Sequence, residues 1–249
     1  DNQLRYDLLL AEKPETLIDD FKNIGHKTIA LMPAITRSWP EGQRFGYDQI
    51  FTHENIDYAG PPLNWVTMPD QFTWSFLQNN IRQGSDGAPL FVELGLISSH
   101  APWTPILEIY DDWNSIADGK IFMEWRDTGP TPKELWMDHD EVKKHYGLSV
   151  DYAINAMTGF AEQYIKEKDL LIVLGDHQAA PLITGDDASK AVPVHVISKN
   201  QNLLEPFLEW GFIPGVVPKN TADVPGMDSF RGMLLEAYSD SILSLQEGR

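Results

Sequence analysis

The sequence contains no cysteine among its 249 residues. This absence excludes disulfide bonds, thiolate zinc sites and cysteine nucleophiles. Basic residues are also scarce, since 19 Lys and Arg stand against 37 Asp and Glu, which gives a formal net charge of −18. Nucleic acids and anionic lipid surfaces need clustered positive charge, so we expect neither as a partner. No apolar run approaches the ~18 residues of a membrane span, so we expect any membrane attachment to lie in segments outside this chain.

Several well-known catalytic motifs are missing as well. The chain has no Gly-x-Gly-x-x-Gly, no P-loop, no Gly-x-Ser-x-Gly elbow and no His-Glu-x-x-His helix. These absences argue against dinucleotide redox chemistry, P-loop phosphate chemistry, esterase-type hydrolysis and zincin proteolysis. What remains is an ordinary globular composition, with 42% hydrophobic and 22% charged residues.

Apolar patterns alternate between helical and strand spacing along the chain. Helical periodicity predicts helices over 14–24, 69–82, 149–166, 203–210 and 227–244. Short apolar runs predict strands over 27–32, 90–97, 170–174 and 192–197. Strands separated by helices predict an α/β fold, with one domain over residues 1–249, a mainly parallel sheet and helices on both faces. The nearly all-apolar run 170–174 is typical of a central parallel strand, and Pro193 favours a strand start or an edge.

Two of the predicted strands run directly into chemically active side chains. The run 170–174 leads into Asp176 and His177, whose carboxylate and imidazole are both ligands of first-row metals. The strand 90–97 leads into His100, a candidate for substrate contact or proton transfer. Because parallel strands end at one edge of a sheet, we expect Asp176, His177 and His100 to meet there. The structural alternatives are a turn-capping aspartate beside an exposed histidine, and a hydrogen-bonded loop histidine.

Two further histidines are candidates on their spacing. His195 lies within the strand 192–197 and either binds substrate from an adjacent strand or is a hydrogen-bonded buried histidine. Glu141 and His145 are four residues apart and share a helical face, as a pair of metal ligands would. Lysines lie between them, so a solvated charged face explains this stretch as well.

Together, these features resemble the sulfatase-like branch of the alkaline phosphatase superfamily. The resemblance rests on the apolar strand before Gly175-Asp176-His177-Gln178 and on the earlier Ser99-His100-Ala101-Pro102-Trp103 segment. The Ala191-Val192-Pro193-Val194 stretch and the order of helix, Gly25 and strand over 14–32 are similar to the same family. The segments 32–40, 58–71 and 192–231 are similar to a group of its bacterial membrane-anchored members.

The resemblance implies a metal-dependent hydrolase or transferase that acts on small or lipid-linked phosphate or sulfate esters through a covalent intermediate. It implies that Asp176 and His177 bind a divalent metal ion, one of Zn, Mn, Mg or Ca. It also implies that His100 contacts the phosphate or sulfate group. The parent protein is then expected to be periplasmic and anchored in the inner membrane.

The sequence also departs from the family pattern. Family members carry a metal-binding carboxylate and a Ser, Thr or modified Cys nucleophile in a segment upstream of where this sequence begins. We therefore expect the chain to be N-terminally incomplete, to bind the metal weakly and to be inactive alone. Glu141 and His145 have the spacing of the family's Asp-x-x-x-His pair, with Glu in place of Asp.

Two other functions stay open at this point. One is a non-catalytic domain that binds a glycan or a lipid headgroup against its loop tryptophans. The other is an inactive folding fragment whose parent protein does the chemistry.

Overall fold

The computed structural model describes residues 14–85, 87–217 and 225–246, together with Leu4, Leu8, Ala11 and Glu12, and for residues 240–246 it describes the backbone only. The chain divides into two compact units, Asp1–Tyr164 and Ile165–Arg249. The sequence predicts one domain over residues 1–249. Among the described helices, none combines the length and the apolar character that crossing a membrane requires.

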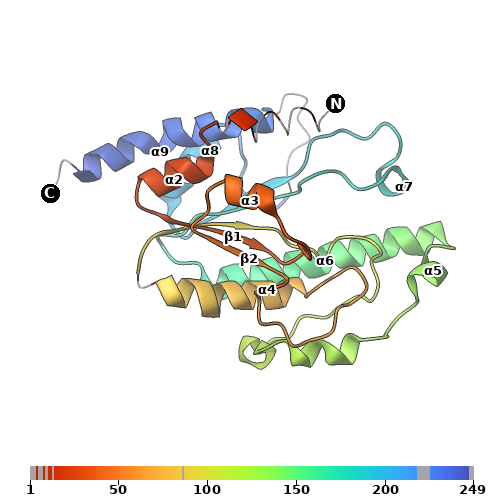
Figure 1. The fold of residues 1–249 in the computed structure, drawn as a ribbon. Helices are drawn as coiled ribbons and strands as arrows, with labels where there is room; N and C mark the ends of the chain where they lie inside the picture. The colour runs from red at the N-terminus through yellow and green to blue at the C-terminus, as the bar shows by residue number, and fades with distance from the viewer. Residues whose placement is uncertain are drawn as a thin grey trace. The chain divides into compact units, whose positions relative to one another are not determined.

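The first unit is built around a parallel sheet of three strands in the order β2-β1-β3 (Figure 1). The strands are β1 (Lys27–Met32), β2 (Gln49–Thr52) and β3 (Leu90–Leu94). β1 is central, and its Ile29 and Leu31 are buried. The predictions of an α/β architecture and of parallel pairing between the strands starting at 27 and 90 are confirmed for this unit.

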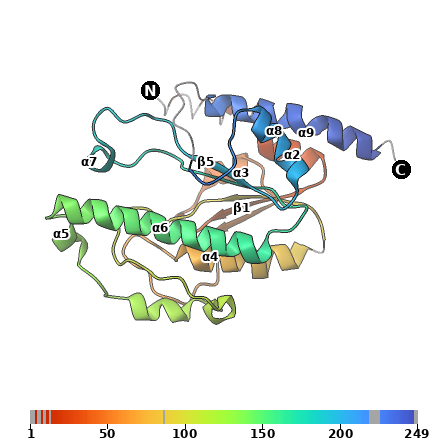
Figure 2. The ribbon, with the colours of Figure 1, turned by 180° about the vertical axis from the view of Figure 1, so that it is seen from behind.

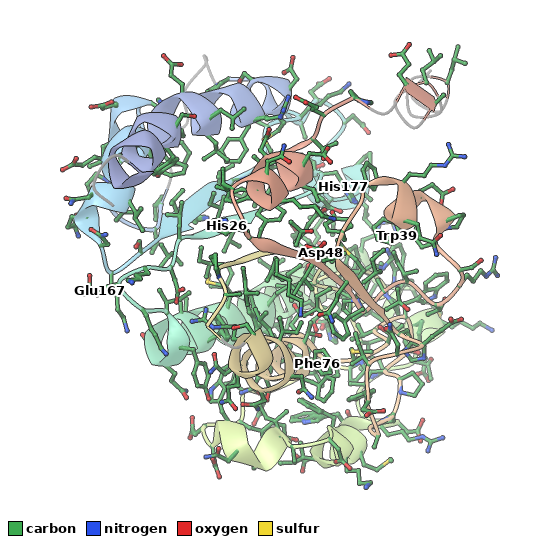
Figure 3. The ribbon with its side chains drawn as sticks, turned by 60° about the vertical axis from the view of Figure 1, so that its left-hand side comes forward. His26, Trp39, Asp48, Phe76, Glu167 and His177 are labelled. Carbon is green, nitrogen blue, oxygen red and sulfur yellow. The ribbon has the colours of Figure 1, made fainter. Side chains whose placement is uncertain are left out.

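Helices cover both faces of this sheet, as Figure 1 shows for α2 on one side and α4 on the other. The α-helices of the unit are α2 (Leu17–Asn23), α3 (Pro40–Arg44), α4 (Asp70–Phe76), α5 (Pro132–Leu135) and α6 (His139–Tyr164). Shorter turns are the π-helix η1 (Leu77–Arg82) and the 3-10 helices η2 (Gln83–Ser85), η3 (Trp113–Ile116) and η4 (Lys120–Trp125). Phe21 of α2 stacks on Phe91 of β3 at 4.5 Å, while Phe76 of α4, labelled in Figure 3, meets Phe51 of β2 edge-on at 5.4 Å.

The long helix α6 runs alongside α4 (Figure 2). The contact includes Trp74 of α4 stacked on Phe160 of α6, with ring centroids 4.5 Å apart. The sequence predicts a helix from residue 149, but α6 begins at His139. The carboxylate of Asp138 accepts the amide protons of Asp140 and Glu141 at 3.0 and 3.3 Å and so caps this earlier start. The charged stretch that follows the cap carries little apolar periodicity, which is why the pattern did not predict it.

A polar contact stabilises the sheet at the end where strand β1 begins. Asp48, labelled in Figure 3, lies just before β2 and accepts hydrogen bonds from the amide and hydroxyl of Thr28 at 2.9 and 3.0 Å. Lys22 of α2 places its Nζ 2.8 Å from the same carboxylate. The hydrogen bond from Lys22, followed by that from the Thr28 backbone, lowers the pKa of Asp48 below its ordinary value.

The second unit contains a two-stranded sheet of β4 (Leu171–Leu174) and β5 (Val194–Ile197). Its helices are α7 (Pro181–Thr184), η5 (Gln201–Leu203), α8 (Glu205–Glu209), η6 (Met227–Ser229) and α9 (Phe230–Gln246). The two strands pair antiparallel. The prediction that 170–174 is a central strand of the parallel sheet was therefore wrong, because this run pairs only with β5 in a separate two-stranded sheet among the described residues. An apolar run does not specify strand direction, and here it does not indicate full burial either, since none of the four residues of β4 is buried. The prediction for Pro193 is confirmed, since β5 begins at the next residue.

Candidate functional site

A buried aspartate organises the segment that follows β3. Asp70, the first residue of α4, has no solvent exposure, and its Oδ1 accepts the amide protons of Ile97 and Ser98 at 2.9 and 2.8 Å. In return, the Ser98 hydroxyl oxygen accepts the amide proton of Asp70 at 2.9 Å. The amide proton of His100 then donates to the carbonyl of Ile97 at 3.0 Å, which closes a tight turn over 97–100. Burial raises the pKa of Asp70 above its ordinary value, against the opposing effect of these hydrogen bonds.

The ring of His100 lies exposed at the end of this turn. Its Nδ1 is 2.7 Å from the carbonyl oxygen of Ala101. Because a carbonyl only accepts, Nδ1 carries the proton and Nε2 presents a lone pair. Trp65 lies beside the imidazole, with ring centroids 6.2 Å apart and planes 24° from parallel. This arrangement gives a surface histidine whose Nε2 can accept a proton or, once protonated, donate a hydrogen bond to an anion.

Trp65 is presented by a tight turn whose ends, Leu63 and Val66, exchange hydrogen bonds of 2.8 and 3.1 Å. Asn64 adopts a φ of 57°, a conformation that asparagine tolerates better than most residues. Its side-chain amide donates to the carbonyl of Thr104 at 2.6 Å and so ties the turn to the segment that carries His100. Trp65 remains 73% exposed at the tip.

The side chains of Glu141 and His145 contact different partners. The carboxylate of Glu141 pairs with Lys144 at 3.2 Å, as a solvated charged face would. The Nδ1–H of His145 donates to the carbonyl of Trp103 at 2.8 Å and anchors α6 to the segment after β3. The sequence did not predict this structural role, and its only signal is that His145 lies one helical turn beyond the buried Val142.

Asp176 and His177 follow β4 and form the candidate metal ligands (His177 is labelled in Figure 3). The Nε2 of His177 lies 3.6 Å from Oδ2 of Asp176. The Nδ1 of His177 is 2.7 Å from the carbonyl of Gln178, so Nδ1 donates and Nε2 carries the lone pair. The other oxygen, Oδ1, accepts the amide proton of His177 at 2.9 Å. Both side chains are largely exposed.

The donor set fits a divalent ion as two of its ligands. Nitrogen and oxygen ligands each lie about 2.0–2.2 Å from zinc, so two ligands of one ion are at most ~4.4 Å apart, and the observed 3.6 Å is within this limit. Where the structure describes the chain, no group of three or more His, Cys, Asp or Glu side chains gathers around a common point. The pair therefore supplies fewer ligands than the three that a catalytic zinc site takes from the protein.

The other two candidate site residues are His195 and His100. His195 of β5 is paired in register with Val173 and donates its Nε2–H to the carbonyl of Val216 at 2.9 Å. This is the bond that a structural histidine makes, and Nδ1 then carries the lone pair. His100 belongs to the first unit and Asp176 to the second, so their meeting at one site stays a prediction from the sequence.

Comparison with known proteins adds no relative. No protein-family model, no curated protein and no solved structure matches the chain. The candidate site is therefore supported by the geometry of its own residues, and the family resemblance stays a prediction.

Proposed function

We propose that the chain is part of a metal-dependent hydrolase or transferase that acts on phosphate or sulfate esters through a covalent intermediate. The observation that carries the proposal is the 3.6 Å distance between Oδ2 of Asp176 and Nε2 of His177. The hydrogen bond from Nδ1 to the carbonyl of Gln178 leaves the Nε2 lone pair for a metal ion. A divalent ion held by this pair would draw charge from an ester oxygen and activate a nucleophile. The resemblance supports an extracytoplasmic protein anchored in the inner membrane and a small or lipid-linked substrate.

The chain's own residues have distinct tasks in this proposal. Asp176 contributes negative charge, and the hydrogen bond from His177 to the carbonyl of Gln178 orients the imidazole. His100, in its protonated form, donates Nε2–H to an anionic oxygen of the ester, where charge develops during transfer. Because the metal pair offers only two ligands, we expect weak metal affinity and at most slow turnover by this chain alone.

Metal binding to the full chain tests the pair directly. Mn²⁺ is titrated into chelator-treated protein and followed by electron paramagnetic resonance. We expect Asp176→Asn and His177→Ala each to weaken binding by about tenfold or more, because each removes one of two ligands. Asp187→Asn is the matched control, since this carboxylate is exposed and belongs to the same unit. Equal affinity in all four proteins contradicts the proposal.

Ester turnover tests the chemistry. The substrates are an aryl phosphate, a bis-aryl phosphate and an aryl sulfate, each with Mn, Zn, Mg or Ca. Any turnover should require the metal and disappear in Asp176→Asn. Turnover that survives both chelation and this substitution contradicts the proposal. Robust metal-dependent turnover supports the chemistry and contradicts only the expectation that the chain alone is inactive.

A separate measurement tests whether His100 lies close to a metal ion bound by Asp176 and His177. Bound Mn²⁺ relaxes nearby nuclei, so the nuclear magnetic resonance signal of His100 Hε1 should broaden when the ion binds at Asp176 and His177. A sharp His100 signal in the Mn²⁺-loaded protein contradicts a shared site.

A second candidate function is favoured by the exposure of Trp65. An indole held beside an imidazole can stack on a sugar ring or contact a lipid headgroup without any catalysis. In that case a neutral glycan or a zwitterionic headgroup should bind in the presence of chelator and lose its affinity in Trp65→Ala. Trp136→Ala is the control, since Trp136 is exposed to 40% and stacks on Trp103.

A further inference from the structure

The side chain of Asp70 does not cap helix α4, since the N-cap residue is Pro69 and its side chain makes no cap hydrogen bond. Asp70 is completely buried, and its Oδ2 has no hydrogen-bond partner among the described residues. A buried carboxylate with an unpaired oxygen costs stability, because the group has lost the water that solvated it. The feature that uses this carboxylate is the turn over 97–100, whose first two amides both donate to Oδ1.

The connection from Asp70 to His100 is short and passes through one residue. Ile97 donates its amide proton to Asp70 at 2.9 Å and accepts the amide proton of His100 on its carbonyl at 3.0 Å. Hydrogen bonds to a charged acceptor are stronger than neutral ones, so a carboxylate holds this turn more firmly than an amide or hydroxyl oxygen would.

The rest of the segment after β3 has anchors of its own. Asn64 donates to the carbonyl of Thr104 at 2.6 Å, and the Thr104 hydroxyl donates to the carbonyl of Pro130 at 2.7 Å. The indole of Trp103 donates to the carbonyl of Ser99 at 2.9 Å and so ties the end of the turn over 97–100 to the later segment. Loss of the Asp70 carboxylate should therefore free Ile97 and Ser98 at the start of the turn, while the later part of the segment and the Trp65 turn stay in place.

We propose that Asp70 is the positioning residue of His100: its carboxylate fixes the turn over 97–100 and thereby holds the imidazole beside Trp65. The inference rests on the proposed function only in treating His100 as the residue that contacts substrate.

The His100 ring next to Trp65 provides a spectroscopic signature of this position. A proton near the face of an indole is shifted by its ring current, so the Hε1 signal of His100 should move when Trp65→Ala removes the indole. The experiment records the histidine Hε1 signals of the full chain without metal or ester, with His100 assigned by His100→Gln. The variants are Asp70→Ala, Asp70→Asn and Asp70→Ser. Thr16→Ala is the control, since it removes a helix cap in the same unit without touching the turn.

We expect Asp70→Ala to shift the His100 signal toward its position in Trp65→Ala. Asp70→Asn should restore the wild-type position, because the amide oxygen still reaches both amide protons. Asp70→Ser keeps an oxygen on a shorter side chain that cannot reach both amide protons, and it should give an intermediate shift even where Asp70→Ala fails to fold. In the wild-type protein, the amide protons of Ile97 and Ser98 should exchange slowly with solvent.

Two results overturn the inference. One is an unchanged His100 signal in folded Asp70→Ala or in Asp70→Ser. The other is an equal shift in Thr16→Ala, which would show a general loosening of the unit. Mn²⁺ affinity should be the same in Asp70→Asn and wild type, so a failed metal proposal and a failed positioning proposal give different results.

Discussion

At the scale of single residues, Asp70 and Asp48 are two carboxylates whose environments act in opposite directions. Burial raises the pKa of Asp70 above 3.8, whereas the hydrogen bond from Lys22 lowers the pKa of Asp48 below 3.8. A raised carboxyl pKa favours the folded state below the unfolded pKa, and this contribution is lost as pH rises through the folded pKa. A lowered carboxyl pKa stabilises the folded state above the unfolded pKa, and this contribution is lost as pH falls through the folded pKa.

The opposite pKa shifts of Asp70 and Asp48 predict opposite effects of the variants Asp70→Asn and Asp48→Asn on stability. Relative to wild type, Asp70→Asn should gain free energy of unfolding between pH 4 and pH 7, because it has no buried charge to form. Asp48→Asn should lose free energy of unfolding relative to wild type as pH rises from about 2 to about 4, because wild type gains its ion pair there, and the difference should stay constant at higher pH. Urea denaturation at several pH values measures both. If the free energy of unfolding of the two variants, relative to wild type, changes with pH in the same direction, the assigned environments of Asp70 and Asp48 are contradicted.

Tyr152 gives a second prediction at this scale. Its hydroxyl is buried and has no hydrogen-bond partner among the described residues. It lines, with Ser98 and Ser149, a cavity of ≈ 10 Å³, which is about the space for the centre of one water molecule. Burial and then the charge of Asp70 raise the pKa of Tyr152, so it is neutral at any physiological pH. Tyr152→Phe should change the free energy of unfolding by less than about 0.5 kcal/mol, since it removes an unpaired group. A loss of about 1 kcal/mol or more in urea denaturation would show that the hydroxyl is bonded to a water in this cavity.

At the scale of elements, helix α2 shows how a local motif sets a boundary. The sequence predicts a helix from Pro14, but α2 begins at Leu17 because Thr16 is its N-cap. The Thr16 hydroxyl oxygen accepts the amide proton of Asp19 at 3.4 Å, and the Asp19 carboxylate accepts the amide proton of Thr16 at 2.8 Å. The predicted end of this helix at residue 24 is confirmed, since Ile24 is the C-cap residue of α2 and Gly25 follows it with a φ of +89°.

The cap gives the element-scale prediction. Thr16→Ala should lower the free energy of unfolding by about 0.5–2 kcal/mol, because it removes an acceptor for an unpaired helix amide. Thr16→Ser keeps that acceptor and should recover most of the loss in the same urea titration. A variant Thr131→Ala in the equivalent capping box of α5 gives a comparison of the same chemistry. Equal stability of Thr16→Ala and wild type contradicts the role of the cap.

The strands show which parts of the fold the sequence can predict. β1 has the predicted bounds, because a buried run closed by Gly25 and by Pro33 leaves little choice. β3 ends at Leu94, earlier than predicted, because the amides of Ile97 and Ser98 bind a carboxylate about 27 positions away in the sequence. Local apolar patterns contain no information about such a distant partner. β2 was not predicted at all, since four residues at a sheet edge carry too little periodicity.

The candidate site also contains residues that the local sequence predicts and residues whose role depends on distant partners. Asp176 and His177 were found because they are adjacent in sequence and follow a strand, and local backbone geometry alone brings their side chains to 3.6 Å. Asp70 was missed, because its importance depends on hydrogen bonds to a segment that follows a different strand. Trp65 was missed as a neighbour of His100 for the same reason.

At the scale of the whole molecule, the net charge of −18 decides which partners can approach. A protein that binds nucleic acid or anionic lipid gains affinity as salt is lowered, because its basic residues release condensed counterions. This chain has nearly two acidic residues for each basic one, so lower salt strengthens repulsion from both surfaces instead.

The prediction is that duplex DNA and phosphatidylglycerol vesicles fail to bind the chain at 150 mM salt and equally at 20 mM salt. Electrophoretic mobility shift and vesicle co-sedimentation measure the two cases, and phosphatidylcholine vesicles control for uncharged contacts. Divalent cations should show the opposite trend, with nonspecific binding to the acidic surface rising as salt falls. The affinity of the Asp176 and His177 pair must therefore be measured at the higher salt, where the Debye length of about 8 Å screens distant carboxylates. Binding to DNA or to anionic vesicles that strengthens as salt is lowered would show a basic surface that the composition conceals, and it would contradict the exclusion of these partners.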